Sequence, residues 1–337
     1  MSELVVERHG AVQVCRLNRP QERNGLTGVL LRQYLAALEE ARTDDAVRVV
    51  VTTGEGDAFS AGADMSDLDG ESARQGLNVL MHEMLGSADT LSTAERTFDR
   101  LGIGRETLAV KNFDKPLIAA VNGAAAGGGF ALAMLHDIRL ASERATFTSA
   151  FVRIGLVAEM GLSYTLPRAI GLEAAMDVMF TGRSVSADEA LAIGMVLRKL
   201  PHERLMDEAM AYAEQIAAQA PIAVQLAKRT LARSLDNSFP AQLELEWPYQ
   251  VAAFDTDDAR EGIIAFRQRR PAALQRTLGG NQFDRYLCGT AQFVALVEDR
   301  DLEVHQVSRR ITGDIDALAD HAATRHHRIA CVDRAKQ

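Results

Sequence analysis

The hydrophobic pattern near the start of the chain alternates between short apolar runs and helical periodicity. Residues 4–17 form two β runs around a turn at Gly10, which predicts a hairpin. Apolar residues then recur at helical spacing over 28–42, directly after Thr27, a residue type that caps helix N-termini. The continuous apolar run at 47–53 is typical of a strand buried on both faces. This strand–helix–strand order predicts a crossover unit of an α/β fold.

The middle of the chain repeats this alternation. Apolar runs at 117–121 and 137–141 predict two further buried strands. Between them, the glycine triplet 127–129 opens an apolar helix. The other predicted elements are helices near 74–86 and 91–111, a short strand at 196–200 and several amphipathic helices within 203–268.

These patterns divide the chain into three regions. Residues 1–200 form an α/β core, 201–274 form a helical C-terminal region, and 275–337 form an appendage. The appendage has nine basic and nine acidic side chains, and charges separate its short apolar patches. Such a composition favours weak local structure and partial disorder over a second core.

Composition narrows the classes of partner. The 337 residues include 37 Lys and Arg against 46 Asp and Glu, for a net charge of −9. That balance argues against a broad nucleic-acid or anionic-membrane surface. Three widely separated cysteines fit neither a disulfide framework nor a metal site, so we expect reduced thiols. No signal core or membrane-length apolar run occurs, which predicts a cytoplasmic protein without a membrane span.

Two small-residue segments could bind a ligand through their backbone. The first, GEGDAFSAGADM at 54–65, follows a buried strand, and ligands bind at the carboxyl ends of strands in open α/β sheets. The second, VNGAAAGGGFALAM at 121–134, leaves N–H groups free at a helix start, which suits an oxyanion or a phosphate. No Lys-Ser/Thr follows the glycines, so the segment is not a P-loop. A plain tight turn and close helix packing are the alternatives.

Glu159 is the candidate general base. It lies in a glycine-flanked apolar run, where desolvation raises a carboxyl pKa towards that of a useful base. The alternative is an exposed glutamate in the first turn of a helix. The histidines have no supporting Cys or carboxylate scaffold, so no metal site is expected.

Four ordered motifs give the chain a family resemblance over about 1–274. The chain resembles the crotonase (enoyl-CoA hydratase/isomerase) superfamily in LNRPQERNGLT (17–27), GEGDAFSAGADM (54–65), KPLIAAVNGAAAGGGFALAMLHDIRLAS (115–142) and FTGRSVSADEALAIGMV (180–196). The resemblance implies a spiral of ββα units and a helical C-terminal region that mediates assembly as a trimer or hexamer. It also implies an acyl-CoA thioester substrate in fatty acid metabolism. No separate cofactor is expected, since coenzyme A is part of the substrate.

The resemblance also assigns catalytic roles. The backbone N–H groups of Ala63 and Gly128 would hold the thioester oxygen while an enolate develops. The two glutamates of the family's hydratases are replaced by Ala131 and Phe151. Glu159 instead matches the single glutamate of the family's Δ3,Δ2-enoyl-CoA isomerases. One carboxylate and one oxyanion site suffice for a 1,3-proton shift, so the prediction is an isomerase.

Other chemistries on this scaffold stay open at this point. Glu159 could activate water in a hydratase, a thioesterase or a C–C hydrolase, or the protein could bind acyl-CoA without turnover. The residues that the resemblance places against coenzyme A are Arg23, Asn24, Leu26, Ala61, Asp64, Phe266 and Arg269.

Overall fold

The computed structural model describes residues 2–64, 92, 101 and 103–274. The chain forms two compact units, Met1–Arg229 and Thr230–Gln337. The helix predicted near 74–86 and the appendage 275–337 lie outside the described residues, as does most of 91–103.

The first unit contains a six-stranded sheet in the order β1-β2-β3-β5-β7-β10. Its first two strands form an antiparallel hairpin, and each later neighbour pairs in parallel. The strands are β1 (Leu4–His9), β2 (Val12–Leu17), β3 (Val49–Gly54), β5 (Leu117–Val121), β7 (Ile138–Ser142) and β10 (Arg198–Leu200).

A second sheet consists of four three-residue strands in the order β4-β6-β8-β9. Three of them pair in parallel, and β9 closes the edge in antiparallel orientation. The strands are β4 (Ala58–Ser60), β6 (Ala124–Ala126), β8 (Thr146–Thr148) and β9 (Ser184–Ser186).

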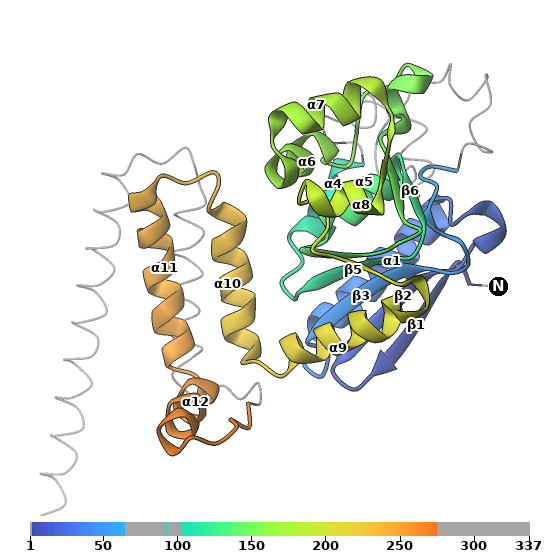
Figure 1. Cartoon of the computed structure of the whole chain (residues 1–337). Helices are drawn as coiled ribbons and strands as arrows, with labels where there is room; N and C mark the ends of the chain where they lie inside the picture. Colours follow the sequence, from blue (N-terminus) through green and yellow to red (C-terminus); the bar gives the residue numbers. More distant parts are fainter. Residues whose placement is uncertain (1, 65–91, 93–100, 102, 275–337) are drawn as a thin grey trace, which may run out of the picture. The chain divides into compact units, whose positions relative to one another are not determined.

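The chain visits the two sheets in turn, and the result is a spiral (Figure 1). A strand of the large sheet is followed by one of the small sheet in each of the pairs β3–β4, β5–β6 and β7–β8. Helices α4 (Gly104–Lys111), α5 (Gly128–Leu135) and α6 (Leu162–Ile170) lie between or after these pairs. The predicted spiral of ββα units is therefore present.

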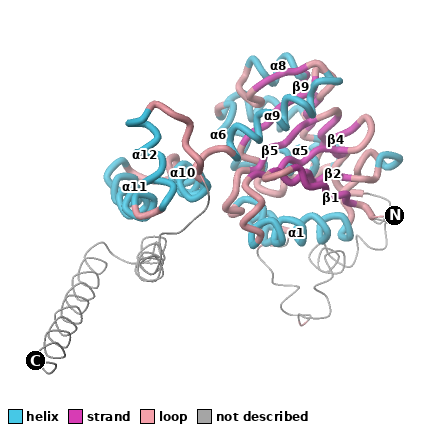
Figure 2. Tube along the Cα trace, turned by 90° about the horizontal axis from the view of Figure 1, so that it is seen from below, coloured by secondary structure: helices cyan, strands magenta, loops and turns pink. Residues whose placement is uncertain are grey.

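Helices cover both faces of the large sheet because alternate side chains of its strands point to opposite faces. On β3, Val50 joins the core shared with α1 (Gly28–Thr43) and α5, whereas Val49 and Val51 pack with α9 (Leu205–Ala217). Figure 2 shows the strands between α1 and α9. Every residue of β3 and β5 is buried, as two covered faces require.

The strand and helix predictions agree with these elements. The hairpin, the buried strands and the short strand at 196–200 are confirmed as β1–β2, β3, β5, β7 and β10. Thr27 caps α1, where its Oγ1 accepts a hydrogen bond from the Leu30 N–H at 3.0 Å. Within the region predicted as helix near 91–111, the structure describes α4.

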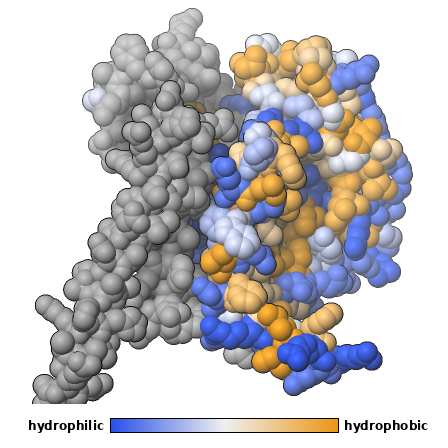
Figure 3. Space-filling view, turned by 90° about the vertical axis from the view of Figure 1, so that its left-hand side faces the viewer, coloured by the Kyte–Doolittle hydropathy of each residue, from blue (hydrophilic) through white to orange (hydrophobic). Residues whose placement is uncertain are grey.

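Helices α7–α9 belong to the first unit, and helices α11 and α12 belong to the second. Helix α9 packs on the large sheet within the first unit, and the division between the units falls within α10. In the second unit, the helices expose several large apolar side chains, among them Trp247 and Phe266. Figure 3 shows hydrophobic side chains among polar ones on one face of the molecule. The other α-helices are α7 (Leu172–Thr181), α8 (Ala187–Ala192), α10 (Pro221–Arg233), α11 (Phe239–Phe254) and α12 (Asp257–Gln268). The short 3₁₀ helices are η1 (Pro20–Glu22), η4 (Ala150–Ile154) and η5 (His202–Arg204).

In the described part of the chain, no helix is both long and apolar enough to cross a bilayer. Cys15, the one cysteine among the described residues, is a buried free thiol, and burial raises its pKa to about 11.

A buried hydrogen-bond network joins α1, β3 and the end of α5. The His136 Nδ1 bonds to the Leu132 carbonyl oxygen at 2.8 Å, which makes this nitrogen the protonated one. Its Nε2 then accepts from the Thr52 hydroxyl at 2.8 Å, with the Tyr34 hydroxyl 3.2 Å away. Burial lowers the pKa of His136 to about 4, so the ring is neutral in the folded protein.

This network predicts loss of stability in acid. The unfolded chain protonates His136 near its ordinary pKa of 6.5, whereas the folded chain resists protonation down to about pH 4. The unfolded state therefore binds more protons within that window, and stability falls as the pH drops through it. We expect this group to remove about 3 kcal/mol of unfolding free energy between pH 7 and pH 4.

Denaturant unfolding of the wild type and His136→Gln at both pH values measures this effect. Other acid-sensitive groups are common to the two proteins, so the stability advantage of the wild type should shrink on acidification. Parallel pH dependences would show that His136 is not held neutral.

Candidate active site

A short backbone pairing fixes the orientation of Ala63. The Leu26 N–H donates to the Gly62 carbonyl at 2.7 Å, and the Asp64 N–H donates to the Leu26 carbonyl at 3.2 Å. These bonds lie on either side of Ala63 and leave its own N–H directed away from Leu26. Among the described residues, the Ala63 N–H has no acceptor.

The second amide lies at the start of α5. The first bond of this helix runs from the Ala131 N–H to the Gly127 carbonyl at 3.0 Å. The Gly127 N–H is already used, since it donates to Thr148 on β8 at 2.9 Å. The Gly128 N–H therefore belongs to the open amides at the positive end of the helix dipole.

Glycines bring together the N–H groups of Ala63 and Gly128, called the amide pair below. Gly62 has φ of +93°, and a Cβ there would lie 2.7 Å from the Ala126 oxygen and 3.0 Å from the Gly128 nitrogen. A Cβ on Gly129 would lie 2.3 Å from the Ser60 oxygen. From Gly128 itself, a Cβ would be 3.7 Å from the Ala63 nitrogen. The loop after β4 and the start of α5 thus approach to distances that side chains would prevent.

Glu159 lies in the loop between η4 and α6, one residue before an unusual backbone turn. Met160 has φ of +51° and Gly161 has φ of +69°, and the latter residue leads into α6. The turn buries Met160, whose Sδ would lie 3.5 Å from a Cβ on Gly128. Because Met160 packs beside Gly128, the residue before it, Glu159, lies near the amide pair.

The surroundings of Glu159 suit a proton acceptor. Its side chain is half-buried, and burial raises the pKa of its carboxyl. None of the described residues donates a hydrogen bond to this carboxylate, so no local cation or donor opposes the effect of desolvation. A carboxylate in this state accepts a proton more readily than one in water.

The positions of the two missing hydratase glutamates are apolar and buried. Ala131 lies within α5 with 0% exposure, and Phe151 lies in η4 with 6% exposure. Neither side chain can transfer a proton. Of the three family carboxylate positions considered from the sequence, the one at Glu159 alone carries a carboxylate.

Comparison with known proteins assigns the family. The model of the enoyl-CoA hydratase/isomerase family matches residues 7–276. The chain belongs to this family. It is therefore an enzyme of the crotonase superfamily, and its fold is the family's spiral.

Similar proteins in the family carry both hydratase and isomerase names. A "Probable enoyl-CoA hydratase" of Rhizobium meliloti is 38% identical over 269 residues, which cover 80% of this chain and 96% of that protein. A solved "probable enoyl-CoA hydratase/isomerase" from Mycobacterium abscessus is 34% identical with a TM-score of 0.68, covering 82% and 100% of the two chains. A solved "monofunctional enoyl CoA isomerase" from M. smegmatis is 32% identical with a TM-score of 0.57, covering 72% and 99%.

Two of the residues predicted to bind coenzyme A have structural partners of their own. Asn24 is fully buried and donates through Nδ2 to the carbonyls of Glu55 and Ala58, at 2.9 and 2.8 Å. Asp64 pairs with the Arg19 guanidinium at 2.8 Å. Both side chains hold the loops around the amide pair in place, and any direct contact of theirs with coenzyme A stays a prediction.

The other predicted contacts differ in their accessibility. Leu26 is buried beside Gly128, whereas Arg23 and Ala61 are exposed on the loops that border the amide pair. Phe266 and Arg269 belong to the second unit, on α12 and at its end. The Phe266 side chain is 85% exposed, which a ligand contact requires, although its role stays a prediction.

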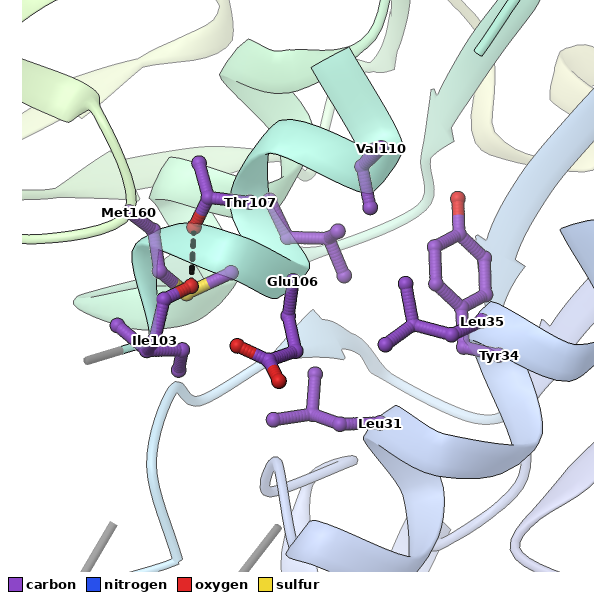
Figure 4. A pocket seen from close by; sticks show the side chains of 9 residues that line it. Leu31, Tyr34, Leu35, Ile103, Glu106, Thr107, Val110 and Met160 are labelled. Atoms are coloured by element: carbon purple, nitrogen blue, oxygen red, sulfur yellow. Dashed lines mark hydrogen bonds between the residues drawn. The ribbon is translucent and has the colours of Figure 1, made fainter. Parts of the chain in front are cut away.

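Glu106, which is not among the residues predicted from the sequence, lines a pocket beside Met160 (Figure 4). Ile103, Glu106, Thr107 and Val110 recur at helical spacing, so the pattern alone places this carboxylate on the apolar face of α4. A charged residue on the apolar face of a predicted helix is a sequence signal that could have identified Glu106. No cluster of three or more His, Cys, Asp or Glu side chains suited to a metal ion occurs within the ranges that the structure describes.

A methyl group added beside the amide pair should lower turnover. In Gly128→Ala the new Cβ makes ordinary contacts and the backbone φ is not positive, so the protein should fold. The methyl group lies 3.7 Å from the Ala63 nitrogen, where it excludes an oxygen atom from the amide pair. We expect turnover to fall at least about tenfold, with the thermal midpoint unchanged or raised.

Gly104→Ala is the matched control, because Gly104 is also the first residue of an eight-residue helix, and a Cβ there would make only ordinary contacts, with Leu101 at 3.6 and 3.8 Å. This variant should keep wild-type turnover. Equal activity of the two folded variants would contradict the role of the Gly128 amide.

Proposed function

We propose that the protein is an enoyl-CoA isomerase that moves a double bond from C3 to C2 of an acyl-CoA thioester. The proposal rests on one observation above the others. The open amide pair lies beside the loop that carries Glu159, whose carboxylate is half-buried. The two positions at which the family's hydratases have glutamates hold Ala131 and Phe151 instead. This set of groups is complete for a proton shift and incomplete for paired acid–base hydration.

In the first step, the Glu159 carboxylate removes a proton from C2 of a 3-enoyl thioester. The electron pair of the C–H bond forms a dienolate, whose negative charge collects on the thioester oxygen. The N–H groups of Ala63 and Gly128 donate to that oxygen. Such donors typically contribute about 2.7–4 kcal/mol each to lowering the barrier.

In the second step, the same carboxyl returns the proton at C4. The dienolate electrons shift to form the C2–C3 double bond, and the oxygen regains its carbonyl bond. Glu159 ends as a carboxylate, so the cycle consumes no water and needs no second titratable group. The raised pKa of Glu159 favours this role, since the carboxyl must hold the proton between the two steps.

Hydration is the second candidate, because the similar Rhizobium protein is named a hydratase. Glu159 alone would then have to activate the water and also supply the proton for C2. A protein with Ala131 and Phe151 at the usual positions lacks the partner that normally divides these tasks. The product, a 3-hydroxyacyl-CoA, distinguishes this candidate from an isomerase.

The finer expectations from the family resemblance belong to the same proposal. Coenzyme A is a part of the substrate, and no further cofactor takes part in either step. Assembly as a trimer or hexamer through the helical C-terminal region, and a cytoplasmic location, complete the proposal.

The first test replaces the base. In Glu159→Gln the side chain keeps its shape and loses its proton affinity, so isomerisation of a 3-enoyl-CoA should fall at least about 100-fold. Binding of acyl-CoA should stay within a few-fold of wild type. Glu143→Gln, which changes an exposed loop carboxylate elsewhere, is the control. Retention of more than about a tenth of the wild-type rate, an effect of about 1.4 kcal/mol or less, would mean that the base lies elsewhere.

The second test is the pH dependence of kcat/KM. Glu159 acts as a base only when it is ionised, and burial raises its pKa above the ordinary value of 4.5. The rate should therefore fall on acidification at a higher pH than for an exposed glutamate. A rate that stays constant down to pH 4.5 would contradict the assignment, provided that the protein stays folded.

A further inference from the structure

We propose that Glu106 selects acyl groups that carry a hydrogen-bond donor, such as a hydroxyl group on the chain. This inference rests on the proposed acyl-CoA substrate and adds a specificity-determining residue to it. Glu106 lies in the first turn of α4 and lines a pocket whose other side chains are mostly apolar.

The Glu106 carboxylate lies among hydrocarbon side chains. Figure 4 shows it between Ile103 of its own turn and Leu31 of α1, with Leu35 close by. Its Oε2 is buried and has no hydrogen-bond partner among the described residues. A buried carboxylate oxygen in such surroundings favours any ligand group that can donate a hydrogen bond to it.

The other polar side chains of the pocket are already paired. The Thr107 hydroxyl donates to the Ile103 carbonyl at 2.9 Å, as the dashed line in Figure 4 marks. The Tyr34 hydroxyl belongs to the network with Thr52 and His136. Of the described side chains that line the pocket, Glu106 alone therefore presents a buried oxygen with unused capacity to accept a hydrogen bond.

Met160 connects this pocket to the amide pair. Its side chain lines the pocket, and its Sδ would lie 3.5 Å from a Cβ on Gly128. It also directly follows the proposed base, Glu159. The Met160 side chain thus separates the Glu106 pocket from the amide pair, and the proposal requires the acyl chain of a thioester held by Ala63 and Gly128 to extend past it.

This geometry makes a directional prediction about substrates. A hydroxyl group on the acyl chain can donate to Oε2, which replaces an unmet hydrogen bond by a charge-assisted one. A purely hydrocarbon chain leaves the oxygen unpaired. A chain that ends in a carboxylate brings a like charge into the same apolar surroundings and is rejected.

The experiment compares ligands that differ by one hydroxyl group. Saturated acyl-CoA esters cannot be isomerised, so their dissociation constants report binding alone. Titration calorimetry with terminally hydroxylated and unsubstituted acyl-CoA esters of matched length should find a length at which the wild type binds the hydroxylated ester about tenfold more tightly. The same preference should appear in kcat/KM for the corresponding 3-enoyl-CoA pair.

Two variants assign the preference to the carboxylate. Glu106→Leu should abolish or reverse it, because the leucine accepts no hydrogen bond, whereas Glu106→Gln should keep part of it. Glu173→Leu is the matched control, since Glu173 is an exposed carboxylate in the first turn of another helix, α7. It should preserve the wild-type preference.

A stability measurement separates selection from a structural role. Removal of a carboxylate with one buried, unpaired oxygen should leave the thermal midpoint of ligand-free Glu106→Leu unchanged or raise it. A large decrease in the midpoint, with no change in ligand preference, would assign Glu106 to the fold and overturn the proposal.

The binding results distinguish the two proposals. Equal affinity of the wild type for both esters at every length would overturn the role of Glu106 and leave the proposed isomerase intact. Failure to bind any acyl-CoA ester would overturn both.

Discussion

The close approach of two backbone segments is the constraint on which the rest of the structure depends. The loop after β4 and the start of α5 meet with Gly62 and Gly129 in positions where a Cβ would lie less than 3 Å from a carbonyl oxygen. This approach puts the N–H groups of Ala63 and Gly128 side by side. The two segments directly follow β4 and β6, which pair with each other in the small sheet.

The chemistry follows from what surrounds that amide pair. Backbone donors need no particular side chain, so the family can keep them while the acid–base groups vary. Here the two hydratase positions are occupied by buried apolar residues, Ala131 and Phe151. The remaining carboxylate, Glu159, enters from the loop before α6, and the buried Met160 anchors that loop beside Gly128. The reaction proposed for this protein is the one that a single base can complete.

Most of the large sheet could be predicted from the sequence. Its strands lie between two helical layers, so apolar runs such as 49–51 in β3 and 117–121 in β5 mark them clearly. The small sheet could not be predicted, since its strands are three residues long. One of them, Ala124–Ala126, has no side-chain pattern at all. Three of these strands, β4, β6 and β8, each directly follow a strand of the large sheet, which brings them next to their partners.

The candidate site shows the same division. Motif resemblance was enough to propose Ala63, Gly128 and Glu159 as site residues, because loops that bind through backbone atoms need small residues in a fixed order. The structural roles of Asn24 and Asp64 in the surrounding loops depend on contacts between distant segments, which spacing along the chain does not encode. Glu106 was detectable as a charge on an apolar helix face, but its unpaired oxygen becomes visible only once α1 and α4 are packed together.

The most direct test of this account follows a hydrogen atom through the reaction. If one carboxyl carries the proton from C2 to C4, then a 3-enoyl-CoA labelled with deuterium at C2 should give a 2-enoyl-CoA with part of the label at C4. Nuclear magnetic resonance or mass spectrometry of the product from a single turnover measures this transfer. The account predicts label at C4 in the wild-type product. Formation of a 3-hydroxyacyl-CoA with no label at C4 would contradict it.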